Sequence, residues 1–141
     1  MIIHENSLTE EIFITLRKHG SFKDYYYEDV KYALKNTLFS VVVFDEFIPV
    51  GMGRVVGDGR IAFFIKDVVV HSDYRGQKIG SLIMNNLLNY IKSAGTKDAY
   101  VGLMSSLGKE KFYEKFGFIT RPNEIYGAGM IMFLKEKGDY E

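Results

Sequence analysis

Residues 65–80, IKDVVVHSDYRGQKIG, decide the fold of this chain. Their apolar, β-branched first part, which ends at His71, predicts a strand. A short polar turn and a basic loop with glycines follow, and the loop opens a long stretch whose apolar residues have helical spacing. A strand that enters a helix through glycines leaves backbone N–H groups unpaired beside the positive end of the helix dipole. The sequence therefore predicts a corner that can hold phosphate groups.

The segments on either side predict a mixed α/β fold in one domain that covers residues 1–141. Helical spacing and caps indicate a helix capped by Ser7 or Thr9 that ends near His19, and further helices over residues 28–36, 80–95 and 109–116. Apolar runs indicate strands over residues 1–4, 41–44, 48–56, 61–70, 99–103, 118–120 and 130–134. The order is β-α-α-β-β-β-α-β-α-β-β. We expect a central mixed sheet, mostly antiparallel, with about four helices on its two faces.

Composition narrows the classes of function. Lysine plus arginine and aspartate plus glutamate both number 18, so the overall charge favours neither nucleic acid nor a membrane as partner. The chain has no cysteine, which excludes disulfides, thiolate metal sites and an acyl-cysteine intermediate. The three histidines lack metal-ligand spacing, so we expect no metal. The N-terminus has no signal pattern and no apolar run approaches membrane length, so the expected compartment is the cytoplasm.

Two glycine-containing stretches compete for the role of a phosphate-binding loop. Gly51-Met52-Gly53 resembles the start of a dinucleotide fingerprint, but Val56 replaces its last glycine and a strand follows instead of a helix. No GxxxxGK[ST] phosphate loop occurs in the chain. The stretch RGQKIG, residues 75–80, is the better candidate because it lies at the predicted strand-to-helix corner.

Two stretches resemble the signatures of the GNAT superfamily of acetyl-CoA-dependent N-acetyltransferases. RGQKIG at 75–80 is similar to the family's acetyl-CoA signature, Arg/Gln-x-x-Gly-x-Gly/Ala, and follows a strand as it does in the family. YEKFGF at 113–118 matches the family's Tyr-x-Lys-x-Gly-Phe. The signatures stand in the family's order, and the predicted element order also matches. The resemblance implies a GNAT-type fold and a single N-acetyltransferase domain with acetyl-CoA as co-substrate.

The resemblance also implies which residues bind acetyl-CoA. Backbone amides between Arg75 and Ser81 would hold the pyrophosphate, and backbone groups of Val68 and Val70 would pair with the pantetheine arm. A backbone amide near Val69 or Val70 would polarise the thioester carbonyl. The full set of expected acetyl-CoA residues is Val68, Val69, Val70, Arg75, Gly76, Gln77, Lys78, Ile79, Gly80, Ser81, Ser106, Phe112 and Lys115.

Two positions depart from the family pattern. Lys78 occupies the slot of the second glycine. If this residue has a positive φ, lysine costs on the order of 1 kcal/mol relative to glycine, and its ammonium group is a candidate cation for the pyrophosphate. Ser106 stands where many relatives have an asparagine that contacts pantetheine.

Tyr113 is the expected catalytic residue, because the matching tyrosine of the family protonates the departing thiolate as a general acid. No general base is evident. The family's base positions fall at Phe64 and Lys66, so we expect a chain of water molecules to accept the proton of the amine. With no cysteine available, the acetyl group is expected to pass directly from CoA to the amine in a ternary complex.

Strict alternation divides the side chains of the strand at 61–70 between two faces. It places Phe64, Lys66 and Val68 on one face and Ile65, Asp67 and Val69 on the other. On this pattern we expect Asp67 to be a buried or hydrogen-bonded structural acid rather than the base.

The acceptor is expected to be a primary amine of a small molecule. The family builds its acceptor site partly between the first two helices, where this chain has tyrosines at 25–27. The expected substrate residues are Phe22, Tyr26, Arg54 and Asp67, and Arg54 is expected either to touch a polar substrate together with Asp58 or to form a surface ion pair with it. The alternatives are a non-catalytic acyl-CoA-binding regulator and a peptide or protein N-acetyltransferase. Exposed closing strands are compatible with a homodimer.

Overall fold

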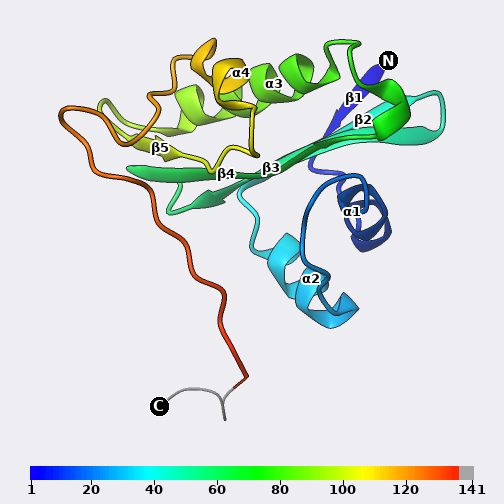
Figure 1. Cartoon of the computed structure of the whole chain (residues 1–141). Coiled ribbons are helices and arrows are strands. Elements are labelled where there is room, and N and C mark those ends of the chain that lie inside the picture. The colour runs from blue at the N-terminus through cyan, green and yellow to red at the C-terminus, as the bar shows by residue number, and fades with distance from the viewer. Residues whose placement is uncertain (137–141) are drawn as a thin grey trace. The chain divides into compact units, whose positions relative to one another are not determined.

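The computed structural model describes residues 1–136, which fall into two compact units, Met1–Leu103 and a second unit that begins at Met104. The first unit contains a five-stranded sheet in the order β1-β2-β3-β4-β5 (Figure 1). Its strands are β1 (Ile2–Glu5), β2 (Phe39–Asp45), β3 (Ile48–Gly57), β4 (Ala62–Val70) and β5 (Tyr100–Gly102). Neighbouring strands are antiparallel except for β4 and β5, which are parallel. The prediction of a mixed, mostly antiparallel sheet is confirmed.

Helices cover both faces of this sheet. α1 (Glu10–Arg17) and α2 (Tyr27–Lys35) lie on one face, and α3 (Ile79–Ala94) lies on the other (Figure 1). A short 3-10 turn, η1 (Ser72–Tyr74), precedes α3, and the second unit contains α4 (Glu110–Glu114). The four predicted helices therefore form, with ends that differ by one or two residues. Within residues 1–136, every helix is too short or too polar to cross a membrane.

The face that carries α1 and α2 has a compact apolar core. Phe13 and Leu16 of α1 and Val30 of α2 pack with Met52 of β3 and Val69 of β4. The spacing of the two α1 residues places them on one side of the helix, where burial of large apolar side chains stabilises the helix on the sheet.

The opposite face requires a close approach of α3 to β3. A Cβ atom on Gly53 would lie 2.7 Å from Cγ2 of Ile83 and 2.9 Å from Cδ1 of Leu87. A Cβ atom on Gly51 would lie 2.9 Å from Cδ1 of Ile83. The two glycines in the middle of a strand thus leave room for a helix, which explains the Gly-x-Gly pattern without a nucleotide.

Asp67 interrupts the regular pairing of β4. The register between β3 and β4 shifts between Met52 and Arg54, so that Asp67 and Val68 together oppose Gly53. Asp67 has a φ of 57°, in the left-handed region that a non-glycine residue seldom occupies. Two residues opposite one, with a local change of backbone conformation, define a β-bulge.

The bulge makes the predicted division of β4 into two faces wrong. Ile65 and Phe39 lie in one row of paired residues that crosses β4, β3 and β2. Because Phe39 stacks on Tyr90 of α3, Ile65 lies on the α3 face. Asp67 and Val69 lie on the α1 face instead. Strict alternation fails because the bulge inserts one extra residue and shifts every side chain beyond it by one step.

The two predicted closing strands, 118–120 and 130–134, are also wrong for the residues that the structure describes, which have no strand there. The apolar side chains of residues 130–134 are all exposed. A strand requires a partner for its backbone N–H and C=O groups. An apolar run indicates a propensity to form a strand but does not specify the strand that pairs with it. This is why the pattern predicted strands that do not form.

Candidate active site

The strand-to-helix corner forms where the sequence predicts it. Gly76 has a φ of 82° and Lys78 a φ of 64°, and Lys78 is the N-terminal cap of α3. The first backbone hydrogen bond of the helix runs from the N–H of Leu82 to the carbonyl oxygen of Lys78, at 3.1 Å. The N–H groups of the first three helical residues precede that bond and have no acceptor within the helix. Alternating left-handed residues before a helix N-terminus form a concave set of donors suited to an anion.

Lys78 therefore has a positive φ, the condition under which the sequence predicts a cost for lysine relative to glycine. Its side chain makes no capping hydrogen bond and is exposed. A Cβ atom on the neighbouring Gly76 would meet nothing within 4 Å, so the backbone conformation, and not lack of space, favours glycine there. Lys78 adopts the same kind of conformation at a cost that glycine would avoid.

His19, which follows α1, holds this corner in place through its backbone and its side chain. The Arg75 guanidinium donates a short hydrogen bond to the carbonyl oxygen of His19. The Ser72 N–H donates to Nδ1 of His19 at 3.3 Å, and the rings of His19 and His71 lie 4.0 Å apart between centroids. Burial, together with the nearby His71 and Arg75, lowers the pKa of His19 below its ordinary value of 6.5. His19 is thus held in its neutral form, in which Nδ1 can accept the bond from Ser72.

The edge of β4 beside the corner is only partly paired. Within the first unit, β5 pairs with β4 at residues 62–64 alone. Residues 65–70 pair with β3 on one edge and have no strand along the edge that faces β5. Val68 and Val70 are half-buried and Val69 is buried, so the side chains hold the strand while this backbone edge remains available for an extended ligand.

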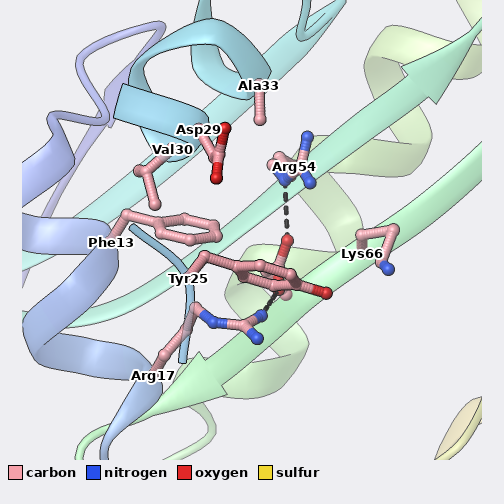
Figure 2. A pocket seen from close by; sticks show the side chains of 9 residues that line it. Phe13, Arg17, Tyr25, Asp29, Val30, Ala33, Arg54 and Lys66 are labelled. Atoms are coloured by element: carbon pink, nitrogen blue, oxygen red, sulfur yellow. Dashed lines mark hydrogen bonds and ion pairs between the residues drawn. The ribbon is translucent and has the colours of Figure 1, made fainter. Parts of the chain in front are cut away.

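A cavity of about 190 Å³ lies on the opposite face from α3, among residues of α1, α2, β3 and β4 (Figure 2). Asp67 is its buried centre, with 5% of its surface exposed. The Arg54 Nε donates to one carboxylate oxygen at 2.7 Å, and the Arg17 guanidinium makes a short ion pair with the other oxygen. The residues that line the cavity are Phe13, Arg17, Tyr25, Asp29, Val30, Ala33, Arg54, Lys66 and Asp67.

Of the predicted substrate residues, Arg54 and Asp67 are brought together in this cavity, whereas Phe22 and Tyr26 do not line it. Phe22 instead packs under the Arg17 guanidinium, 4.6 Å from the ring centroid, and Tyr26 is 84% exposed. The neighbouring Tyr25 takes the place expected of Tyr26. The prediction that Asp67 is a buried, hydrogen-bonded acid is confirmed.

Arg54 does not pair with Asp58, so that prediction is wrong. The Asp58 carboxylate accepts the backbone N–H groups of Arg60, Ile61 and Ala62 at 2.8, 2.9 and 3.1 Å. These bonds, that of Arg60 first, lower the pKa of Asp58, because they stabilise the ionised carboxylate. Asp58 closes the turn between β3 and β4, which satisfies it without a cation.

Sequence reasoning missed Arg17 and Asp29 as cavity residues. Arg17 follows Phe13 by four positions on α1, so it continues the buried stripe of that helix. A long cationic side chain on an otherwise apolar stripe was the available signal. Its partner Asp67 is fifty positions away in the sequence, which no local pattern reveals.

The residues of the second signature lie in the second unit. Tyr113 is half-buried on α4, with its ring 5.0 Å from that of Phe112 and 6.4 Å from that of Phe118 between centroids. Burial raises the pKa of Tyr113 above its ordinary value of 10.0, so its hydroxyl carries a proton at neutral pH. Ser106 accepts the N–H of Lys109 through its carbonyl oxygen at 3.0 Å, and Lys115 is exposed.

Comparisons with known proteins identify the family. A model of the acetyltransferase (GNAT) domain matches residues 9–135. A crystal structure from meticillin-resistant Staphylococcus aureus, of a protein of unknown function described as a probable acetyltransferase, is 35% identical, with a TM-score of 0.83 and coverage of 94% of this chain and 100% of that one. The chain therefore belongs to the GNAT acetyltransferase family.

Two further similarities extend this finding. An uncharacterized N-acetyltransferase, ycf52, of Pyropia yezoensis is 28% identical over 102 residues, which cover 70% of this chain and 58% of the relative. The chain spans about half the length of the curated relatives it matches. An aminoglycoside 6'-N-acetyltransferase in complex with coenzyme A has the same fold, with a TM-score of 0.58, 23% identity and coverage of 67% of this chain and 58% of that one.

Proposed function

We propose that this protein transfers the acetyl group of acetyl-CoA to a primary amine of a small molecule. The observation that carries the proposal is the corner between β4 and α3, where left-handed residues and a helix N-terminus follow a strand with a half-open edge. Family membership and the coenzyme A found with a neighbour of the same fold support acetyl-CoA as the donor. We keep the cytoplasm as the expected compartment.

The residues at the corner fit acetyl-CoA. Backbone amides of residues 75–81 would bind its pyrophosphate, and the open backbone edge at Val68 and Val70 would pair with its pantetheine arm. A backbone N–H near Val69 would stabilise negative charge on the carbonyl oxygen. When bound, acetyl-CoA supplies an activated acetyl group and a thiolate leaving group.

The proposed chemistry assigns the protons as follows. The amine loses its proton to water, because neither Phe64 nor Lys66 is a base. The Tyr113 hydroxyl, which its raised pKa keeps protonated, gives a proton to the departing thiolate. The bond from the amine nitrogen to the acetyl carbon forms as the thioester bond breaks, without an acyl-enzyme, since the chain has no cysteine.

The test is release of free CoA, measured by thiol titration across a panel of amines. Tyr113→Phe is expected to lower kcat by about 100-fold, within the range of general acid catalysis, while acetyl-CoA affinity in calorimetry changes little. Tyr32→Phe, an exposed residue of α2 that does not line the cavity, is the matched control and should keep full activity. Equal turnover in Tyr113→Phe would remove Tyr113 from the chemistry. Binding of acetyl-CoA without turnover of any amine would favour a non-catalytic regulator instead.

A further inference from the structure

The cavity over Asp67 has an excess of positive charge. Three cations line it, Arg17, Arg54 and Lys66, against the two carboxylates of Asp29 and Asp67. A single negative charge would bring the lining to neutrality. The two guanidinium groups are nearly buried, with 11% and 12% of their side chains exposed. A cation withdrawn from water without full compensation is costly, so this cavity favours an anionic ligand.

Asp67 cannot supply all of that compensation. Its two oxygens are already divided between Arg17 and Arg54, one oxygen for each. The carboxylate of Asp29 is exposed in the first turn of α2, where the positive end of the helix dipole stabilises it independently of the cavity. The two nearly buried guanidinium groups thus share one buried carboxylate, which leaves this buried cluster with a net charge of one.

The guanidinium groups also have hydrogen-bonding capacity to spare. Arg54 donates through Nε to Asp67 and through Nη1 to the Thr37 hydroxyl at 3.2 Å. Arg17 donates to Asp67 and through Nη2 to the carbonyl oxygen of Lys23 at 2.8 Å. Each guanidinium has more N–H donors than these bonds use, and the planar fork matches the geometry of a carboxylate.

Aromatic rings hold one of these forks in position. The Arg17 guanidinium carbon lies 5.1 Å from the ring centroids of both Phe13 and Tyr25, within the range of a cation–π contact. Figure 2 shows Arg17 below the Tyr25 ring and Arg54 above it, with Lys66 to one side on the sheet, and all three line the cavity. A fork that the fold already orients loses little entropy when it binds a ligand.

The size and the walls of the cavity suit a small ligand group. The volume of the cavity is about 190 Å³. Phe13, Val30 and Ala33 give it apolar walls. These features fit a short aliphatic or aromatic body with one anionic group.

We propose that the acceptor is an amino monocarboxylate, a small amine with one carboxylate, and that its carboxylate binds to Arg17, Arg54 and Lys66 in this cavity. The inference rests on the proposed acetyltransferase function and specifies its substrate class. A carboxylate is preferred to a phosphate because the net charge of the lining is one, whereas a phosphate ester is close to a dianion at neutral pH. Lys66 and Arg54 lie opposite each other on β4 and β3, so both would bind the same carboxylate.

The experiment compares matched amines in the CoA-release assay. The series is 4-aminobutanoate, its amide, butylamine and an aminoalkyl phosphate of similar length. We expect kcat/KM for the amino acid to exceed that for the amide by at least about tenfold, the effect of a charge-assisted hydrogen bond of about 1.4 kcal/mol. Equal or better turnover of the amide or of butylamine would overturn the carboxylate assignment while leaving acetyl transfer intact. A higher kcat/KM for the aminoalkyl phosphate than for the amino acid would contradict the proposal that the bound group carries a single negative charge.

A substitution in the cavity lining tests whether the preference for the amino acid arises in this cavity. Lys66 is exposed, so Lys66→Gln should fold, and we expect it to reduce the preference for the amino acid over its amide severalfold. Lys31→Gln, an exposed lysine of α2 outside the cavity lining, is the matched control and should keep that preference. An unchanged preference in Lys66→Gln would place the carboxylate elsewhere.

A binding measurement separates this inference from the proposed function. Butanoate and butanamide, which lack the amine, are titrated calorimetrically into the protein with CoA present. Tighter binding of butanoate supports the cavity assignment even if no amine is turned over, in which case only the transferase proposal fails. Absence of any difference between the two would overturn the cavity assignment.

Discussion

Replacement of Lys78 by glycine should stabilise the protein. Lys78 has a φ of 64° and a ψ of 19°, the left-handed conformation, and its side chain makes no capping bond. That conformation costs a residue with a Cβ atom roughly 1–2 kcal/mol relative to glycine. Glycine also raises the entropy of the unfolded chain, which offsets about 0.5–1 kcal/mol of the stability gained by removing this cost. The expected net gain for Lys78→Gly is therefore about 0.5–1 kcal/mol, or about 1–4 °C in Tm for a domain of this size.

Lys78→Ala separates backbone strain from charge. It removes the same ammonium group but keeps the Cβ atom, so its Tm should stay near that of the parent protein and below that of Lys78→Gly. If the ammonium contacts pyrophosphate, both variants should lose acetyl-CoA affinity equally, by up to about fivefold for an exposed charge pair. Calorimetric Tm values and acetyl-CoA titrations measure the two effects. Equal Tm values for the glycine and alanine variants would refute the strain argument.

Three further changes test other parts of the structure. Asp67→Ala leaves two nearly buried guanidinium groups without their shared carboxylate, and should cost about 3–5 kcal/mol of unfolding free energy in urea titrations; a loss below about 1 kcal/mol would mean that solvent already compensates them. Gly53→Ala places a Cβ atom 2.7 Å from Ile83 and should cost about 1–3 kcal/mol, whereas Gly127→Ala, with nothing within 4 Å, should be nearly neutral. Because the pKa of His19 is lowered in the folded state, stability should fall as pH drops below about 6.5, where the unfolded chain binds the extra proton. His19→Gln should flatten this dependence, and an unchanged pH profile of Tm would contradict the assignment.

Features with a local signal could be predicted from the sequence. Thr9 caps α1 by accepting the N–H of Ile12 at 3.2 Å, as a threonine before an apolar periodic segment indicates. The corner at 75–80 formed because its glycine and the helix that follows act within a few residues of one another. The sequence also drew attention to Lys78, although the sign of its φ was left as a condition that the structure settles. These predictions did not depend on tertiary contacts.

Features that depend on distant partners could not be predicted. Tyr25 and Tyr26 are adjacent aromatic residues in one loop, and only the tertiary fold decides that the first lines the cavity and the second is exposed. Arg54 had a nearby acid in Asp58, yet backbone amides already satisfied that carboxylate. The ion pair formed instead with Asp67, whose side chain a bulge turned toward Arg54. Residues 130–134 had the composition of a strand, but composition does not supply a pairing edge.

Asp67 connects the two halves of the proposed reaction. Its backbone forms the bulge in β4, directly before Val68 and Val69, where the thioester is proposed to lie. Its side chain is the buried anion that holds Arg17 and Arg54 in the cavity where the acceptor carboxylate is proposed to bind. A regular strand would have sent this side chain to the α3 face, away from both arginines. The extra residue in β4 therefore places the buried carboxylate of the cavity beside the strand along which the donor is proposed to bind, which would hold an acceptor next to it.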